Sequence, residues 1–103
     1  MIHVLAFITT KPGQRDTVLK IFQANVPAVL AEKGCIAYEA TVDAVPALKF
    51  QTEFGADTFV VIEKWESLDH LRAHGASPHM AAYAAKTKDL IANRVIHVLS
   101  PAA

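Results

Sequence analysis

The chain has 103 residues, of which 52% are hydrophobic and 19% charged, and its ten basic and ten acidic residues cancel. This length allows one domain, residues 1–103, and the apolar composition excludes intrinsic disorder. A neutral chain without a Lys/Arg cluster lacks the electrostatic footprint of a nucleic-acid-binding protein, and no apolar run reaches the roughly 18–20 residues of a membrane span. With no signal-peptide pattern and the single cysteine Cys35, we expect a cytoplasmic domain that binds neither nucleic acid nor membrane.

The first predicted element is a strand over Ile2–Thr10, whose two alternating faces are both largely apolar. The Lys11-Pro12-Gly13 turn ends it. A helix is predicted from about Gln14 to Lys33, because apolar residues recur along it at helical spacing. Pro27 lies inside this pattern and is expected to kink the helix or end its regular part. Gly34 is expected to be the C′ residue of the helix.

Two further strands are predicted in the middle of the chain. The first covers Cys35–Val42, with Ile36, Tyr38, Ala40 and Val42 on one side. The second covers Thr58–Trp65 and has a clear alternating pattern. Between them, Asp43–Asp57 is long for a loop in so small a domain, with short strand extensions expected around Leu48–Thr52; loops of this length are often functional.

The C-terminal third predicts two short helices and a strand. Ser67 caps a helix that runs to about His74 and stops at Gly75, and Ser77-Pro78 begins the next helix. The last strand is predicted over Asn93–Leu99. The inner face of the second short helix is expected to hold Met80, Tyr83, Ala84, Thr87, Leu90 and Ile91.

This element order, βαββαβ with a split second helix, predicts an α+β fold of the ferredoxin-like type. It would have an antiparallel four-stranded sheet with its helices on one face. Because both strand faces are apolar, we expect a second copy to cover the other face in a homodimer. His3 and His97 lie in the terminal strands, which we expect to be non-adjacent, and each is interpreted as structural.

Three histidines fall within ten residues, at His70, His74 and His79. The i, i+4 pair His70 and His74 could hold a metal, but no cysteine or carboxylate cluster completes a ligand set, and we expect no metal. His70 is interpreted as a surface or capping residue. His74 and His79 flank Gly75, where two helices meet, and such a position can aim a side chain into a pocket.

Glu63 and Trp65 share one face of an apolar strand. A carboxylate there should be paired, hydrogen-bonded or shifted in pKa, and the alternative is a strand-end salt bridge. Trp65 is either a core or interface anchor or part of a pocket wall. Tyr83 either packs with a wet hydroxyl or offers its phenol to a pocket. The glycine loops that bind nucleotides, the CxxC pair and the GxSxG elbow are absent, so no nucleotide or flavin site is predicted.

The segment TFVVIEKWESLDHLRAHGASPHM, residues 58–80, resembles the antibiotic biosynthesis monooxygenase domain family, and most closely its quinol monooxygenase branch. The shared pattern is an apolar strand, E-x-W, a short helix, a histidine and then S-x-H. The resemblance extends over essentially the whole chain. The matching residues are Glu63, Trp65, His74, Ser77 and His79.

The resemblance implies a dimeric α+β barrel with a pocket between sheet and helices in each subunit. It implies oxidation of quinol-like or polycyclic phenolic substrates with O2 and without a cofactor, the substrate supplying the electrons. On this model His74 is the general base, His79 a second candidate, and Glu63 orients a histidine or the pocket edge. Trp65 and Tyr83 would be aromatic walls, with Phe50 and Phe54 in a loop that acts as a lid.

Other functions stay open at this stage. One alternative is a non-catalytic dimeric domain that binds a small molecule or is associated with stress. Another is an isomerase of the same family. Haem degradation is disfavoured, because Ala6 and Ala84 stand where the haem-degrading relatives have an asparagine and a haem-ligating histidine.

Overall fold

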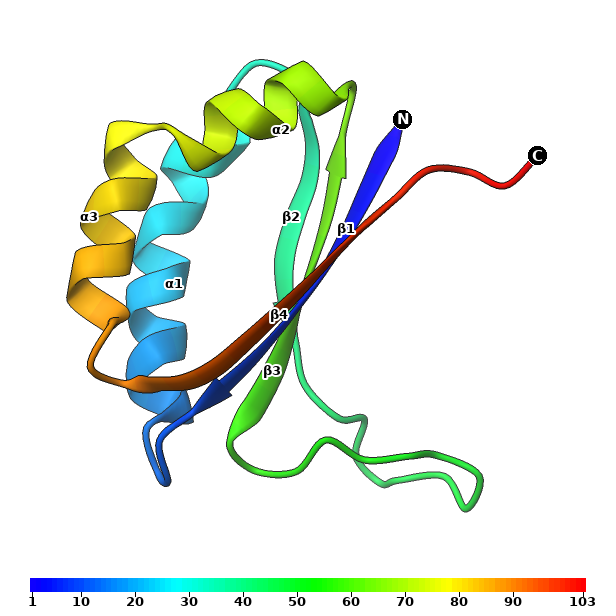
Figure 1. The fold of residues 1–103 in the computed structure, drawn as a ribbon. Helices are drawn as coiled ribbons and strands as arrows, with labels where there is room; N and C mark the ends of the chain where they lie inside the picture. Colours follow the sequence, from blue (N-terminus) through cyan, green and yellow to red (C-terminus); the bar gives the residue numbers. More distant parts are fainter.

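The computed structural model describes residues 1–103 as one sheet with three helices packed on one of its faces (Figure 1). The ferredoxin-like βαββαβ prediction is confirmed, with the second helix split in two. The elements in chain order are β1 (Ile2–Thr10), α1 (Arg15–Leu30), β2 (Cys35–Thr41), β3 (Thr58–Trp65), α2 (Leu68–Gly75), α3 (Pro78–Thr87) and β4 (Ile91–Leu99).

The sheet has the strand order β2-β3-β1-β4, and every neighbouring pair is antiparallel. The first and last strands are therefore adjacent, and the expectation that His3 and His97 lie on non-adjacent strands was wrong. His3 pairs with Leu99, and His97 pairs with Leu5. The strand β1 lies inside the sheet, between β3 and β4, and β4 forms one edge.

Strand alternation gives the sheet two different faces. On β1 the even-numbered residues from Ile2 to Thr10 are buried, and the odd-numbered ones are half-buried. On β3 the residues Phe59, Val61, Glu63 and Trp65 are buried in the same way. Because successive side chains of a strand point to opposite faces, these buried sets form the inner face against the helices. The other face carries no helix and is called here the open face.

The strand β2 departs from simple alternation near its start. Cys35 pairs with Trp65 and Ala37 with Lys64, so Ile36 is an extra residue in a bulge. Ile36 is consequently exposed, and the prediction that it shares a face with buried Tyr38 was wrong. Cys35 is half-buried, and burial raises the pKa of its thiol.

The helix α1 packs on the inner face through Val18, Phe22 and Val29. It continues past Pro27, whose ring lies on the exposed side, and ends at Leu30 rather than near Lys33. Gly34 is therefore not the C′ residue. It has a φ of +79° and forms the turn that leads into β2.

The two short helices begin as the sequence predicts. The hydroxyl of Ser67 accepts a hydrogen bond from the backbone N–H of His70, and that of Ser77 accepts one from Met80. The helix α3 ends at Thr87, and β4 begins at Ile91 rather than Asn93. Leu90 and Ile91 therefore lie outside the helix, which shortens its predicted inner face.

The loop 43–57 contains no strand, so the extensions expected around Leu48–Thr52 are absent. Asp43 organises the loop, because its carboxylate accepts hydrogen bonds from the backbone N–H groups of Phe54 and Gly55 at 3.0 and 2.9 Å. These bonds hold the pKa of the Asp43 carboxyl below its ordinary value. The ring of Phe54 lies 5.4 Å from that of Phe7, an open-face residue of β1.

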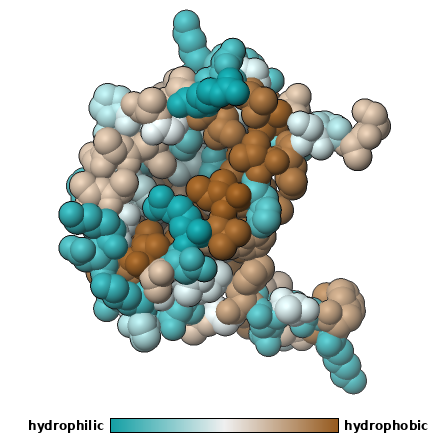
Figure 2. Space-filling view, viewed as in Figure 1, coloured by the Kyte–Doolittle hydropathy of each residue, from teal (hydrophilic) through white to brown (hydrophobic).

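The helices cover the sheet unevenly. The helix α1 packs on β1 and β2, and α2 packs on β3, whereas β4 has exposed side chains on both faces. In Figure 2, apolar side chains follow the line of β4 across the front of the molecule. The inner side of β4 and its neighbour β1 therefore borders a space that no helix fills. None of the three helices has the length and apolar character needed to cross a bilayer.

Gly34 offers a test of the turn between α1 and β2. A Cβ at this position would overlap the ring of His70, whereas a Cβ at Gly13, which has the similar φ of +77°, would meet open space. We expect Gly13→Ala to lower the free energy of unfolding by about 1–2 kcal/mol from left-handed backbone strain. Gly34→Ala should lower it by roughly 1–3 kcal/mol more, from overpacking.

Chemical denaturation of both variants and of Gly34→Ala/His70→Ala measures the two contributions separately. The double variant should recover part of the extra loss, because the ring that clashes has been removed. Equal losses for Gly13→Ala and Gly34→Ala would contradict the contact between residue 34 and His70.

Candidate active site

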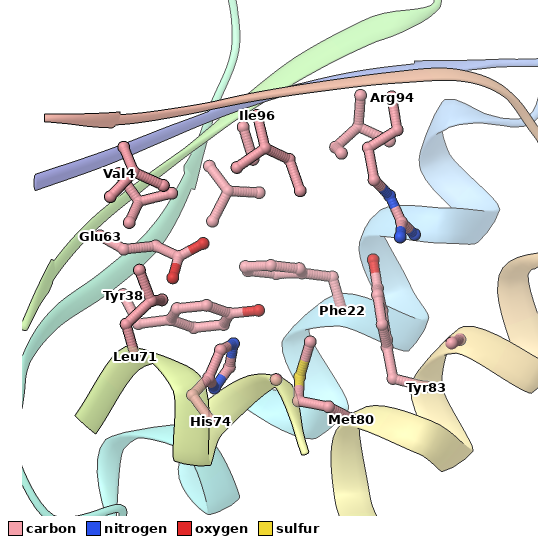
Figure 3. A pocket seen from close by; sticks show the side chains of 16 residues that line it. Val4, Phe22, Tyr38, Glu63, Leu71, His74, Met80, Tyr83, Arg94 and Ile96 are labelled. Atoms are coloured by element: carbon pink, nitrogen blue, oxygen red, sulfur yellow. The ribbon is translucent and has the colours of Figure 1, made fainter. Parts of the chain in front are cut away.

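A pocket of about 360 Å³ lies between the inner face of the sheet and the helices (Figure 3). Twelve of its sixteen lining residues are hydrophobic, and every helix and strand contributes at least one. The lining consists of Val4, Ala6, Ile8, Phe22, Tyr38, Val61, Glu63, Leu71, His74, Gly75, Met80, Tyr83, Ala84, Arg94, Ile96 and Val98. An apolar cavity with a few convergent polar groups is the usual form of a small-molecule site.

Aromatic rings form one side of this pocket. The rings of Phe22 and Tyr38 are stacked with centroids 5.0 Å apart, and Tyr83 meets Phe22 edge-on at 6.1 Å. Burial raises the pKa of the Tyr38 phenol far above its ordinary value, and that of Tyr83 to about 12. Both phenols therefore stay neutral at physiological pH. A flat aromatic molecule has suitable surfaces to pack against here.

Glu63 supplies a carboxyl group to the pocket. Its Oε1 accepts a hydrogen bond of 2.9 Å from the indole N–H of Trp65, two residues along the same strand. Burial raises the pKa of Glu63 above its ordinary value of 4.5, against the opposing effects of this hydrogen bond and of nearby His74. The prediction that this carboxyl is hydrogen-bonded and shifted in pKa is confirmed.

His74 lies in the last turn of α2, with its imidazole at the pocket wall. Its ring centroid is 4.7 Å from that of Trp65 and 5.5 Å from that of Tyr38. The hydroxyl of Ser77 donates a hydrogen bond of 2.8 Å to the backbone carbonyl of His74, which fixes the junction of α2 and α3. The His74 ring is therefore held by packing against Trp65 and Tyr38, and its backbone is held by the helix junction.

Behind His74, away from the pocket, lies a carboxylate that sequence reasoning missed. Glu32 Oε2 is 2.7 Å from His74 Nδ1 and 2.9 Å from His79 Nε2. The expectation that no carboxylate joins the histidines was therefore wrong, and the three side chains place potential ligand atoms within 4.8 Å of one another. Glu32 lies just beyond the end of α1, and no spacing in the sequence connects it with residues 74–79.

His70 takes no part in this cluster, so the i, i+4 pair with His74 does not form a site. Its Nδ1 is 2.7 Å from the hydroxyl of Ser67, and its ring packs beside Gly34. The capping interpretation of His70 is confirmed, although the side chain is half-buried rather than on the surface.

The structure brings only some of the predicted site residues to the pocket. His74, Glu63 and Tyr83 line it. Trp65 is fully buried and does not line the pocket, as in the alternative of a core anchor, so the aromatic wall consists of the expected Tyr83 together with Tyr38 and Phe22. His79 contacts Glu32, not the pocket.

The two loop phenylalanines lie elsewhere. Phe50 is 87% exposed, and Phe54 packs on the open-face residue Phe7. The expected lid over the pocket of the same chain was therefore wrong, because the loop follows β2 on the side of the sheet away from the helices (Figure 1).

Arg94 is a second pocket residue that the sequence pattern did not identify. It lies on β4 opposite Ile8, and its guanidinium projects into the pocket near Tyr83 (Figure 3). The signal was present, because Arg94 alternates with the apolar residues Ile96 and Val98 on one strand face.

Comparison with known proteins identifies the family of this chain. The family model described as "Antibiotic biosynthesis monooxygenase" matches residues 1–86. The chain belongs to the antibiotic biosynthesis monooxygenase family. It is 43% identical to the Escherichia coli (strain K12) protein described as "Probable quinol monooxygenase YgiN", over 98% of each chain. It is 30% identical to the Bacillus subtilis (strain 168) "Putative monooxygenase YcnE", over 88% of this chain and 86% of that one.

The fold of the family is also seen in solved structures. The crystal structure of PA3566 from Pseudomonas aeruginosa superposes with a TM-score of 0.82 at 24% identity, over 99% of this chain and 94% of that one. Family membership and the E. coli relative support monooxygenase activity for this chain. The resemblance drawn from the residues Glu63 to His79 is confirmed.

The raised pKa of Glu63 predicts a dependence of stability on pH. A buried carboxyl prefers its neutral form in the folded protein, so its stabilising contribution is complete below about pH 4.5 and is lost as the pH rises through the raised value. Glu63→Gln keeps a hydrogen-bond acceptor for Trp65 but does not titrate. The stability of this variant relative to the native protein should therefore increase as the pH rises across that interval.

Urea denaturation at several pH values from 4 to 8 measures the difference, with Glu53→Gln in the exposed loop as the control for removing one carboxylate. A stability difference between Glu63→Gln and the native protein that is constant with pH would contradict the assignment.

Proposed function

We propose that this protein is a cofactor-independent monooxygenase that oxidises quinol-like or polycyclic phenolic substrates with O2. The observation that carries the proposal is the position of one imidazole, His74, at the wall of a largely apolar and aromatic pocket. The description of the E. coli relative as a "Probable quinol monooxygenase" supports the substrate class. The aromatic lining supports a flat, electron-rich ring as the ligand.

The first step is removal of a phenolic proton. His74 makes its only hydrogen bond to protein through Nδ1, which leaves Nε2 without a protein partner. In this proposal Nε2 accepts the proton of the substrate hydroxyl. An imidazole in this position can accept that proton and release it later, as a general base does. The surrounding apolar side chains exclude water and leave the phenolate poorly solvated, which raises its reactivity toward O2.

The substrate anion then supplies the electrons. A ring carbon beside the phenolate forms a bond with O2, and the resulting peroxide takes up a proton. Loss of water breaks the O–O bond and leaves a carbonyl on that carbon. One hydroquinone and one O2 thus give one hydroxylated quinone and one water. Glu63, whose pKa is raised by burial, is assigned to return a proton to the peroxide.

A homodimer is part of the proposal. The open face has apolar side chains on all four strands, and Val95 and Leu99 of β4 are more than 40% exposed. A second sheet packed on this face would bury them and form the α+β barrel. In that assembly the exposed loop 43–57 of each copy would extend over the partner rather than over its own pocket.

Anaerobically prepared menadiol is the substrate for the test. We expect the pure, chelator-treated protein to accelerate O2 uptake above autoxidation, with one 18O atom from 18O2 in the hydroxylated product. His74→Ala should lower kcat/KM by about 10²–10⁴, the range for loss of a general base. His70→Ala, on the same helix but outside the pocket, should keep its activity per folded protein.

Two results would count against the function. Production of menadione and hydrogen peroxide without 18O incorporation would identify a two-electron oxidase instead. Tight binding of menadione without turnover of any hydroquinone would favour a ligand-binding domain.

The homodimer is tested by sedimentation velocity at micromolar concentration. Ile62 lies on the open face of β3, paired with Leu5 and Glu39. A lysine there would place an unpaired charge in the interface, so Ile62→Lys should sediment as a monomer or fail to fold. Ala85→Lys on the exposed side of α3 should stay dimeric. A native protein that is monomeric and folded would refute the assembly.

A further inference from the structure

One carboxylate oxygen, Glu32 Oε2, contacts two imidazoles at once, at His74 Nδ1 and His79 Nε2. We infer that Glu32 is a positioning residue that holds His74 with its proton on Nδ1 and the Nε2 lone pair toward the pocket. The catalytic consequence rests on the proposed function, in which His74 is the base. The positioning itself can be tested without activity.

The protonation states follow from what each group can donate. An ionised carboxylate only accepts hydrogen bonds, so at 2.7 and 2.9 Å both ring nitrogens must carry their protons. A neutral imidazole has one N–H, and His74 therefore has none on Nε2. In Figure 3 the His74 ring has one nitrogen toward the Tyr38 ring and the cavity. This is the tautomer that a base needs, because the free lone pair faces the substrate.

Burial strengthens the arrangement. The side chain of Glu32 is 13% exposed and that of His74 is 7% exposed, so the pair is largely shielded from water. In such a shielded site a hydrogen bond to the carboxylate is stronger than it is in water. Glu32 thus holds the orientation of the His74 ring.

His79 holds the carboxylate from the other side. Its Nε2 lies 2.9 Å from Glu32 Oε2 and 3.2 Å from the Ser77 hydroxyl. Because His79 and Ser77 both belong to the start of α3, the carboxylate is tied to the helix junction that also carries His74. His79 is therefore assigned to fix Glu32, and not to contact substrate.

The alternative is that the same three side chains, Glu32, His74 and His79, bind a metal ion. Tetrahedral zinc with ligand bonds of about 2.0–2.1 Å separates neighbouring ligand atoms by about 3.3 Å. The two contacts at 2.7 and 2.9 Å are shorter than this and match charge-assisted hydrogen bonds. The geometry therefore favours hydrogen-bonded histidines over ligands arranged around an ion.

The first measurement is the tautomer of His74, from long-range 1H–15N NMR of the imidazoles at a pH where they are neutral. We expect the native protein to show His74 protonated on Nδ1. Glu32→Ala should give a mixture with Nε2-protonated ring, whereas Glu66→Ala, at an exposed carboxylate, should not change the spectrum. A native His74 protonated on Nε2 would overturn the inference, even if Glu32→Ala does not fold.

The second measurement is kinetic, with menadiol and O2. Removing an orienting carboxylate should lower kcat at least about tenfold and change KM little, because Glu32 does not touch the substrate. Glu32→Gln keeps an acceptor for the Nδ1 proton but lacks the charge, so its kcat should lie between those of the native protein and Glu32→Ala. Unchanged kcat and tautomer in a folded Glu32→Ala would overturn the assignment.

The outcomes separate this inference from the proposed function. If the native protein does not oxidise hydroquinones but its His74 tautomer depends on Glu32, the positioning role stands and the proposed function fails. Isothermal titration with ZnCl2 tests the alternative that the three side chains form a metal site. Stoichiometric micromolar binding that Glu32→Ala abolishes would assign the cluster to a metal and overturn the inference.

Discussion

Three helices cover only part of a four-stranded sheet, and the rest of the molecule follows from that mismatch. The helix α1 packs on β1 and β2 and α2 on β3, whereas no helix packs closely on the inner side of β4. The space left there is the pocket. Its lining is apolar because the strand alternation that builds the core also points apolar side chains into this space. The catalytic candidates lie at the boundary between packed and unpacked regions, where a polar group can be buried yet reach a ligand.

The fold could be predicted from the sequence because strand and helix periodicity, Ser caps and glycine turns are local properties. The strand order was misjudged at one point, since alternation within β1 and β4 does not say which strands are neighbours. The ends of α1 and the start of β4 shifted by a few residues for a related reason. Tertiary contacts, not local propensity, decide where an element stops.

Only those site residues that lie close together in the sequence could be predicted from it. Glu63, Trp65 and His74 lie within one strand–helix unit, and the pattern in that segment identified them. Glu32 lies more than forty residues away and reaches His74 only because α1 ends beside α2. Trp65 was placed in the wall by the family resemblance. Alternation gives the face of the sheet on which it lies but not its depth, and at the end of β3 it is covered by other side chains.

The position of β4 at the edge of the sheet also decides which substitutions in the pocket lining the fold tolerates. Its pocket residues Ile96 and Val98 are 54% and 48% exposed, so they contribute to the cavity without belonging to the densely packed core. Substituting them alters the shape of the cavity at small cost in folding free energy. The lining residues Phe22 and Val61 belong to the core and have no such freedom. Ligand preference can therefore drift along one edge strand while the rest of the lining and the fold are retained.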